Sequence, residues 1–239
     1  MDYKKILFTG GGGLLGTAFK KIIPDMCYPA EQEFNLTKIE QMDEYLKQGN
    51  FSIVFHAAAF TSPPKVDQNP REAIDVNIIG TANLVKLCMK YNIKLIYVST
   101  DYVFRGDRGN YVEDDPVYPV NKYAWSKLGG ETAVRMYDNS LVIRTTFGPD
   151  IFPYEKAFVD QWTSRECVSK TAGMIAQIID MDIKGTIHIG GARKTVFEYA
   201  NSLSPDKVIK ELSVNEINFK VPVDTSLNCQ FYNSLVMKK

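Results

Sequence analysis

The feature that most constrains this fold is a glycine-rich segment close to the N-terminus. Three glycines follow the short apolar run Ile6–Thr9, at positions Gly10, Gly13 and Gly16. Glycine at this spacing between a strand and a helix permits a tight turn, a close approach of phosphate and close helix packing. The helical run Leu14–Ile23 then offers unpaired N–H groups, around Leu14 and Leu15, to an anion. The segment predicts a site for a dinucleotide pyrophosphate, and the alternative is a plain glycine-rich turn.

Apolar strand-like runs alternate with helical patterns along the chain. The strand-like runs are Ile6–Thr9, Ser52–His56, Lys94–Ser99, Ser140–Arg144 and Thr186–Ile189. The helical patterns are Leu14–Ile23, Lys38–Lys47, Arg71–Tyr91, Tyr123–Tyr137 and Ser169–Ile179. Strands that are apolar throughout and separated by helices are typical of a parallel sheet covered on both faces. We therefore predict an α/β fold built on a Rossmann-type, doubly wound parallel sheet.

The composition changes after Pro149, where the hydrophobic periodicity becomes weak. We expect residues 1–149 to form a dinucleotide-binding domain. Residues 150–239 would form a small, reduced substrate-binding lobe that returns at least one strand and one helix to the main sheet.

The overall charge excludes some classes of partner. Lys plus Arg and Asp plus Glu number 28 each, so no net field attracts nucleic acid or an anionic membrane.

No run of 18 apolar residues and no charged-then-apolar leader is found, so a cytoplasmic protein is expected. The scattered cysteines fit free thiols in a reducing compartment: Cys27, Cys88, Cys167 and Cys229. With two histidines in the chain, we expect no histidine-based metal site.

The predicted second strand, Met26–Tyr28, precedes the place where such folds often carry an acid for the adenosine ribose. Glu31 and Glu33 are candidates, although neither lies at a strand end. No arginine accompanies them, so a 2′-phosphate lacks its usual guanidinium partner. The choice between NAD and NADP stays open.

The next strand ends in three alanines, Ala57, Ala58 and Ala59, directly after His56. Small residues at the carboxyl end of a parallel strand provide a floor on which a cofactor can approach the backbone. The alternative is small-residue packing against a helix. Pro63 and Pro64 are expected to exclude a helix immediately afterwards, which favours the floor. His56 is interpreted as a packed residue rather than an acid–base group.

Hydroxyl groups and a Tyr–Lys pair are the candidates for chemistry. Ser99 and Thr100 end a central strand, where their hydroxyls would face the ligand crevice. Tyr123 and Lys127 lie four residues apart and share one face of a helix. An ammonium beside a phenol lowers the phenol pKa and makes the tyrosine a usable acid or base. Alone the pair would fit an ordinary helix surface, but together with the other motifs it favours catalysis.

These motifs resemble those of the extended short-chain dehydrogenase/reductases that act on nucleotide sugars. The GxxGxxG pattern is Gly10–Gly16, the HAAA floor is His56–Ala59, and the YxxxK pair is Tyr123 with Lys127. Within that class the chain is most similar to the dTDP-4-dehydrorhamnose reductase family, whose STDYVF motif stands intact at Ser99–Phe104. The similarity covers about residues 5–148 well and continues more faintly beyond.

The resemblance implies NAD(P)-dependent reduction of a 4-keto nucleotide-sugar in deoxysugar or surface-glycan biosynthesis. Thr100 would hydrogen-bond the reacting carbonyl and Tyr123 would protonate it. Lys127 would bind the nicotinamide ribose, and Asn77 matches a position that supports the active site. Dimers are common in the family, which allows a homodimer here.

The same resemblance assigns further residues to the cofactor. Asn35 and Leu36 fall where the family contacts adenine, although Asn35 replaces the usual aspartate. The nicotinamide end would be lined by Ser99, Thr145 and Thr146. The cofactor would be NADP or NAD, and no metal is implied.

Two departures limit the comparison. Related dehydratases carry Asp-Glu after the threonine, whereas Asp101-Tyr102 stands here, so dehydration is not expected. The segment after Pro149, which usually supplies the nucleotide-sugar contacts in relatives, is also shorter here than in typical relatives.

Two other functions stay open: a nucleotide-sugar 4-epimerase, and a non-catalytic cofactor-binding subunit like the beta subunit of methionine adenosyltransferase.

Overall fold

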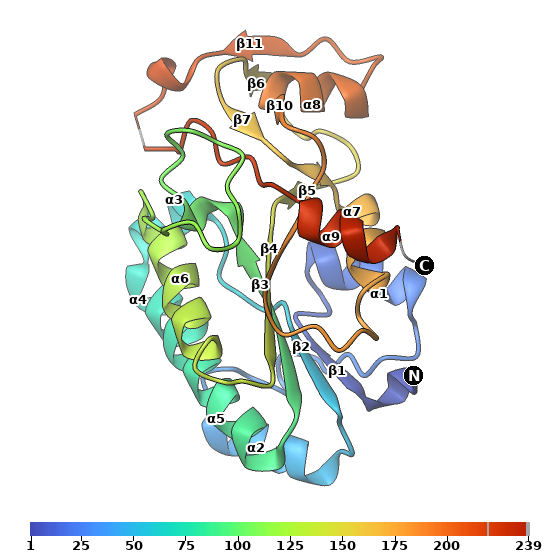
Figure 1. The fold of residues 1–239 in the computed structure, drawn as a ribbon. Coiled ribbons are helices and arrows are strands. Elements are labelled where there is room, and N and C mark those ends of the chain that lie inside the picture. Colours follow the sequence, from blue (N-terminus) through green and yellow to red (C-terminus); the bar gives the residue numbers. More distant parts are fainter. Residues whose placement is uncertain (219, 238–239) are drawn as a thin grey trace.

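The computed structural model describes residues 1–218 and 220–237. Its centre is a parallel sheet in the order β1-β2-β3-β4-β9 (Figure 1). The strands are β1 (Ile6–Thr9), β2 (Ile53–His56), β3 (Lys94–Thr100), β4 (Ser140–Thr145) and β9 (Gly185–Ile189). All neighbouring pairs are parallel, and β1, β2 and β4 are buried along their whole length. The prediction of an α/β fold on a parallel sheet is therefore confirmed.

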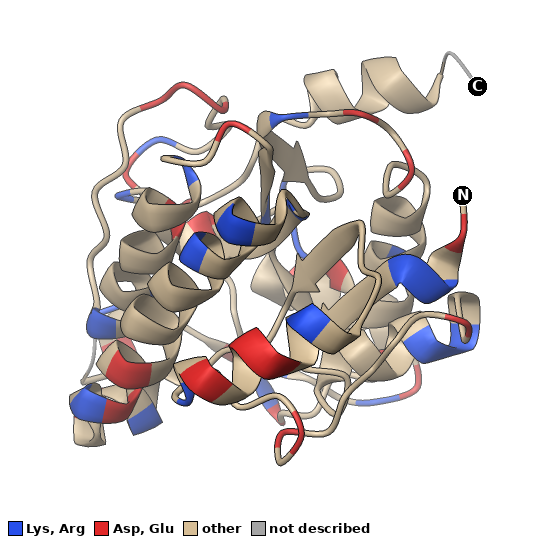
Figure 2. Cartoon of the chain, turned by 90° about the horizontal axis from the view of Figure 1, so that it is seen from below, with Lys and Arg blue, Asp and Glu red and all other residues tan. Residues whose placement is uncertain are grey.

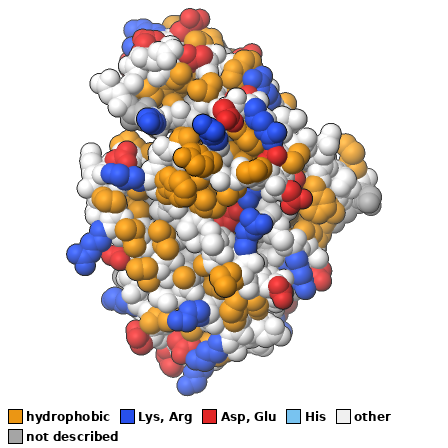
Figure 3. Space-filling view, turned by 60° about the vertical axis from the view of Figure 1, so that its left-hand side comes forward, with side chains coloured by type: hydrophobic (Ala, Val, Ile, Leu, Met, Phe, Trp, Pro, Cys, Tyr) orange, Lys and Arg blue, Asp and Glu red, His pale blue; other side chains and the backbone are white. Residues whose placement is uncertain are grey.

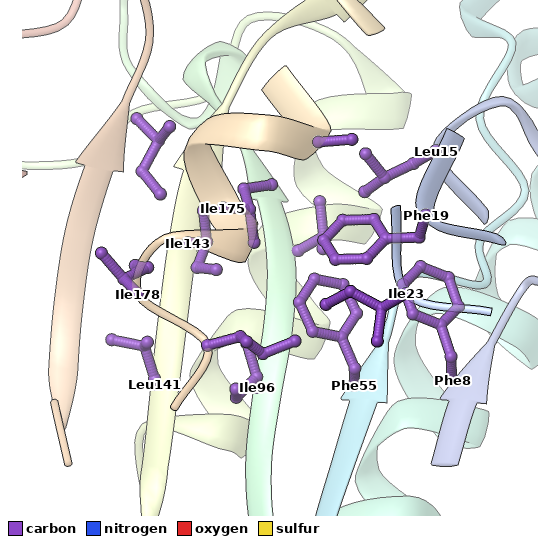
Figure 4. Packing of buried hydrophobic residues seen from close by; sticks show 14 of the residues in the cluster. Phe8, Leu15, Phe19, Ile23, Phe55, Ile96, Leu141, Ile143, Ile175 and Ile178 are labelled. Carbon is purple, nitrogen blue, oxygen red and sulfur yellow. The ribbon is translucent and has the colours of Figure 1, made fainter. Parts of the chain in front are cut away.

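Helices cover both faces of the sheet (Figure 1). On one face lie α1 (Leu14–Ile22), α7 (Val168–Ala176) and α9 (Gln230–Val236), and on the other lie α2 (Ile39–Gln48), α5 (Thr81–Tyr91) and α6 (Lys122–Val134). Because side chains alternate along a strand, β1, β2, β3 and β4 contribute to both cores, whereas the apolar side chains of β9 join the core on the α1–α7 side. Figure 4 shows the α1–α7 side, where Phe8 and Phe55 stack with ring centroids 4.7 Å apart.

The predicted strand Met26–Tyr28 is reduced to a single bridge. Cys27 pairs in parallel with Leu7, and its backbone bonds Phe8 and Ile6 at 2.8 and 2.9 Å. Pro24 and Pro29 flank the segment, and proline interrupts the ladder because it has no N–H to donate.

The helical pattern predicted at Arg71–Tyr91 is divided. It consists of α4 (Pro70–Ala73), the π-helical segment η2 (Ile74–Gly80) and α5. A π-segment inside a helix often accompanies a functional site, because its wider turn changes the direction of a side chain. Here it contains Asn77, which is buried beside the candidate site.

The expectation that Pro63 and Pro64 exclude a helix is wrong, because they open α3 (Pro63–Gln68). A proline in the first turn loses no intrahelical hydrogen bond, and its fixed φ suits a helix start. The alanines before it remain outside regular structure.

The segment after β4 adds a small lobe at one end of the sheet (Figure 1). Its short strands pair as β5 (Phe147–Gly148) with β8 (Glu166–Cys167), β7 (Trp162–Thr163) with β10 (Lys194–Thr195), and β6 (Lys156–Phe158) with β11 (Lys210–Leu212). Helix α8 (Val196–Leu203) packs on them, while α7 and β9 return to the main body. The 3-10 turns are η1 (Tyr3–Lys5), η3 (Asp101–Val103) and η4 (Val214–Glu216). The division at residue 149 stays a prediction.

Charges of both signs are interspersed over the outer helices (Figure 2). Among the described residues, no helix has the length and apolarity needed to cross a membrane. The same part of the chain contains no group of three His, Cys, Asp or Glu side chains that could hold a metal ion.

Candidate active site

A cleft of about 1430 Å³ follows the carboxyl ends of the sheet strands. Its lining includes every residue that the sequence assigned to catalysis or cofactor binding: Gly10, Gly13, Leu14, Leu15, Gly16, Asn35, Leu36, Ala57, Ala58, Ala59, Ser99, Thr100, Tyr123, Lys127, Thr145 and Thr146. The structure thus brings together segments from β1 to β4, which are three strand spacings or about 14 Å apart.

The glycine loop forms the β1 end of the cleft. Gly10 has φ +78°, and a Cβ there would lie 2.8 Å from the Ala58 backbone. A Cβ on Gly16 would lie 2.5 Å from the Gly10 carbonyl oxygen. Both positions therefore require glycine for the chain to pack at all.

Gly12 and Gly13 are less crowded than Gly10 and Gly16. A Cβ on Gly12 meets nothing within 4 Å, and one on Gly13 meets only the Gly10 carbonyl oxygen, at 3.3 Å. Gly13 is the N-cap of α1, and no side chain from the described part of the chain caps that helix. The free N–H groups and the helix dipole suit a pyrophosphate, so this loop fits a dinucleotide.

The wall beyond the loop fits the adenosine part of a cofactor. The Asn35 Oδ1 accepts hydrogen bonds from the Thr37 backbone and hydroxyl at 2.8 and 2.6 Å, which holds this turn. Leu36 is buried beneath it. Glu31 and Glu33 also line the cleft, and so do two cations that the sequence did not assign to it, Lys20 and Arg71.

Thr100, Tyr123 and Lys127 approach the cleft from two elements, the end of β3 and the first turns of α6. The Asn121 side chain caps α6 by accepting from the Ala124 N–H at 2.9 Å. The Thr100 hydroxyl donates to Asp101 at 3.1 Å.

Asn77 connects the alanine floor to α6. Its amide exchanges two hydrogen bonds with the Phe60 backbone, at 2.8 and 2.9 Å, and donates to the Ser126 hydroxyl at 2.9 Å. Ser126 in turn donates to the Tyr123 carbonyl at 2.8 Å. The π-segment therefore holds the position of the helix turn that carries the tyrosine.

The predicted lowering of the Tyr123 pKa is not what the structure supports. Burial raises the pKa of the Tyr123 phenol above its ordinary value, Asp101 adds to this, and the Thr100 hydroxyl opposes it. Burial also lowers the pKa of Lys127 to about 7, against the effect of Glu131. The Lys127 ammonium lies 4.2 Å from the Tyr97 ring centroid. Spacing places the two groups on one face, but desolvation dominates their ionisation.

A buried ionic network lies beneath the catalytic end. Glu131 and Arg144 are both 0% exposed and pair at 2.7 Å. Glu131 also accepts from the Ser99 hydroxyl at 2.6 Å, and Arg144 donates to the Glu113 carbonyl at 2.9 Å. Ser99 is thus turned toward Glu131, which ties β3, β4 and α6 together.

One polar atom in the cleft lacks a partner. Among the described residues, the Thr145 Oγ1 is buried and makes no hydrogen bond. A buried hydroxyl without a partner is costly, so such a group is expected to have a ligand atom beside it. Its place at the end of β4 fits the nicotinamide end of a dinucleotide.

Sequence reasoning missed three residues at this end. Asp101 is 1% exposed and accepts from the Thr225 hydroxyl at 2.6 Å. Burial raises the pKa of Asp101 to about 6, while Thr225, Arg165 and Thr100 oppose the shift. Arg165 lines the cleft and donates to the Thr146 hydroxyl at 3.4 Å. Asp101 could have been suspected because it follows Thr100, whereas no local signal marks the other two.

The sheet, the glycine loop and the Tyr–Lys pair in one cleft define an extended short-chain dehydrogenase/reductase fold. The model of the RmlD substrate binding domain matches residues 4–171. The chain therefore belongs to the RmlD substrate binding domain family.

Similar proteins carry two kinds of name. The rat methionine adenosyltransferase 2 subunit beta is 27% identical, over 84% of this chain and 71% of that protein. The dTDP-4-dehydrorhamnose reductase of Aggregatibacter actinomycetemcomitans is 26% identical, over 86% of this chain and 70% of its own length. The crystal structure of dTDP-4-dehydrorhamnose reductase from Bacillus anthracis, solved with NADP, has the same fold. It matches with a TM-score of 0.88 and 24% identity, covering 96% of this chain and 92% of that one.

Proposed function

We propose that this protein is an NAD(P)-dependent reductase of 4-keto nucleotide-sugars, cytoplasmic, and active in deoxysugar or surface-glycan biosynthesis. The proposal rests on one observation. The cleft that contains the glycine loop and the N-terminus of α1 is also lined by Thr100, Tyr123 and Lys127. Membership of the family and relatives named as reductases support it. Residues 1–149 would bind the cofactor, and residues 150–239 would bind the sugar nucleotide.

The chain's own groups suit a reduction. A bound reduced nicotinamide supplies hydride to a carbonyl carbon. The raised pKa of Tyr123 keeps the phenol protonated, so it can donate that proton to the carbonyl oxygen. Lys127, with a pKa near 7, binds the ribose hydroxyls and can return a proton to the tyrosine. A carbonyl oxygen would replace Asp101 as the acceptor of the Thr100 hydroxyl.

The test is oxidation of NADH and NADPH in the presence of a panel of 4-keto nucleotide-sugars, followed by absorbance. Turnover with one of them, lost in Tyr123→Phe, is the expected result. Tight binding of a dinucleotide with no turnover on any of them would overturn the proposal.

A non-catalytic cofactor-binding subunit is the second candidate. The similarity to methionine adenosyltransferase 2 subunit beta favours it. The retained Thr100, Tyr123 and Lys127 favour the enzyme, because a binding module needs no acid–base group. If the wild-type protein binds the cofactor but turns over no nucleotide-sugar, the non-catalytic subunit is favoured over the enzyme.

The homodimer allowed by the resemblance also belongs to this proposal. Large hydrophobic side chains are exposed on η2 and α6, at Ile74, Ile79 and Trp125. These elements lie on the side turned forward in Figure 3, where hydrophobic side chains gather among Lys and Arg. Sedimentation of the wild type and of Trp125→Lys tests the dimer.

A further inference from the structure

Lys20 lies in the wall of the cleft beside the glycine loop. It is an exposed residue of α1. A Cβ on Gly11 would lie 3.5 Å from the Lys20 Cε, so the stem of the lysine lies against the loop. The Lys20 ammonium lies 5.3 Å from the centroid of the Tyr28 ring. Lys20 is therefore placed between the loop that suits a pyrophosphate and the segment that follows the bridge at Cys27.

Tyr28 is a fixed support for this lysine. Its hydroxyl donates to the Ile23 carbonyl at 2.8 Å, and its ring centroid lies 5.3 Å from that of Phe8. A cation over an aromatic face is attracted by the ring quadrupole, which holds the ammonium at Tyr28. In folds of this kind, the residues that end the second strand contact the 2′ position of the adenosine ribose. The ammonium of Lys20 is thus held where the 2′ substituent of a dinucleotide would lie.

The residues directly after the bridge at Cys27 carry no carboxylate. They are a tyrosine, a proline and an alanine, and the first acids that follow are Glu31 and Glu33. The Glu33 carboxylate accepts from the Ala30 N–H at 2.7 Å, which closes the turn. The strand end therefore lacks the acid that would bind the 2′-hydroxyl of NAD and repel the 2′-phosphate of NADP.

The ammonium of Lys20 is not paired with an acid. Five other lysines pair with a carboxylate within 4.0 Å: Lys90, Lys94, Lys122, Lys170 and Lys194. Within residues 1–218 and 220–237, no such pair involves Lys20. The other lysine that lines the cleft, Lys127, lies at the catalytic end. A lysine ammonium carries a compact charge and three donors, which suit a phosphate group.

The second cation in this part of the cleft lining, Arg71, is placed differently. It pairs with Asp75 at 3.8 Å within the α4–η2 segment. That segment packs with α6, whereas α1 packs with α7, so Arg71 and Lys20 approach the cleft from different faces of the sheet (Figure 1). Lys20 is the cation that lies beside the glycine loop.

We propose that Lys20 binds the 2′-phosphate of the cofactor and makes this chain select NADP over NAD. The discrimination comes from a helix residue, in place of a residue at the end of the second strand. The inference deepens the proposed function, because it names the dinucleotide, but it rests only on the dinucleotide site and can be measured without a sugar.

The experiment is calorimetric titration of the full chain with NADP and with NAD, which differ only in the 2′-phosphate. The variants are Lys20→Met, which keeps the apolar stem and removes the charge, and Lys20→Arg, which keeps the charge. The matched control is Lys21→Met, the same change on the next residue of α1, which is exposed and outside the cleft lining. Arg71→Met tests the second cation.

The wild type is expected to bind NADP about 10- to 100-fold more tightly than NAD. Lys20→Met removes that preference by weakening NADP alone, because NAD has no group at the lysine. Lys20→Arg keeps the preference, and Lys21→Met binds both dinucleotides as the wild type does.

Equal or tighter binding of NAD by the wild type, a preference that survives in Lys20→Met, or no binding of either dinucleotide would overturn the inference. A preference lost in Arg71→Met and kept in Lys20→Met would also overturn it and assign the phosphate to Arg71. The outcome is separable from that of the reductase proposal. A Lys20-dependent preference for NADP without turnover of any 4-keto nucleotide-sugar keeps the inference and removes the reductase, whereas equal turnover with NADH and NADPH does the reverse.

Discussion

The two ends of the cleft are built in different ways. At the β1 end, one continuous segment, Gly10–Gly16, supplies backbone groups, and its conformation follows from the glycines themselves. At the β4 end, side chains come from β3, α6, β4 and the small lobe, and burial controls their ionisation. The comparison teaches that binding of the cofactor and chemistry on the substrate should respond to different substitutions.

The largest effect is expected at the catalytic end. Tyr123→Phe removes the proton donor, so kcat should fall by about two to four orders of magnitude. The Kd of the cofactor should not change, because the phenol is not at the glycine loop. Steady-state kinetics with fluorescence titration of the reduced cofactor measures both. An unchanged kcat would remove Tyr123 from its role.

At the glycine end the opposite split is expected. Gly13→Val places a branched side chain where the pyrophosphate would approach, and its Cβ lies 3.3 Å from the Gly10 carbonyl oxygen, a tight contact that the loop must relieve by a small shift. Cofactor affinity should fall by about 100-fold or more, equivalent to about 2.7 kcal/mol. Gly173→Val is the control, because nothing lies within 4 Å of a Cβ at Gly173 on α7. A folded Gly13→Val protein with wild-type affinity would mean that this loop holds no phosphate.

Thr145→Val should have two effects of opposite sign, one on stability and one on cofactor affinity. It removes a buried hydroxyl that has no protein partner, so the protein without cofactor should gain about 1 kcal/mol of stability. If that hydroxyl bonds the nicotinamide, cofactor affinity should fall by about tenfold. Thr146→Val is the matched control, since its hydroxyl accepts from Arg165 and its removal should bring no such gain. Thermal melting with and without cofactor reports both effects, and a loss of stability in Thr145→Val would contradict the assignment.

A pH dependence of stability is expected at Asp101. Its pKa is raised to about 6, so the folded protein holds a proton there that the unfolded chain has released. The resulting stabilisation is complete below about pH 4 and is lost as the pH rises through about 6. The stability of the wild type relative to Asp101→Asn should therefore fall by up to about 2–3 kcal/mol across this range. Melting temperatures at a series of pH values test it, and a difference that rises with pH would refute the raised pKa.

The sequence was sufficient to predict the fold and the site wherever neighbouring residues determine the conformation. The glycine loop, the apolar strands and the spacing of Tyr123 and Lys127 are local features, and the structure brings them into one cleft. The sequence was insufficient for this where burial, or packing between residues distant in the chain, determines the local structure or the pKa. The proline pair opens a helix, the strand at Cys27 shrinks to one bridge, and the Tyr123 pKa moves opposite to the direction that its lysine neighbour alone predicts. Contacts such as that of Asp101 with Thr225 join residues far apart in the chain, and no local sequence pattern predicts them.

The most direct test of the central claim is to follow deuterium from the cofactor. Reduced NAD(P) that carries deuterium at the transferring carbon of its nicotinamide is supplied with a 4-keto nucleotide-sugar, and the sugar is analysed by mass spectrometry. A reductase predicts one deuterium at the former carbonyl carbon of the product, and labelled product that forms about 100-fold more slowly, or more slowly still, when Tyr123→Phe replaces the wild type under the same conditions. A cofactor that binds tightly while the sugar stays free of deuterium would contradict it, and would leave a dinucleotide-binding module in place of an enzyme.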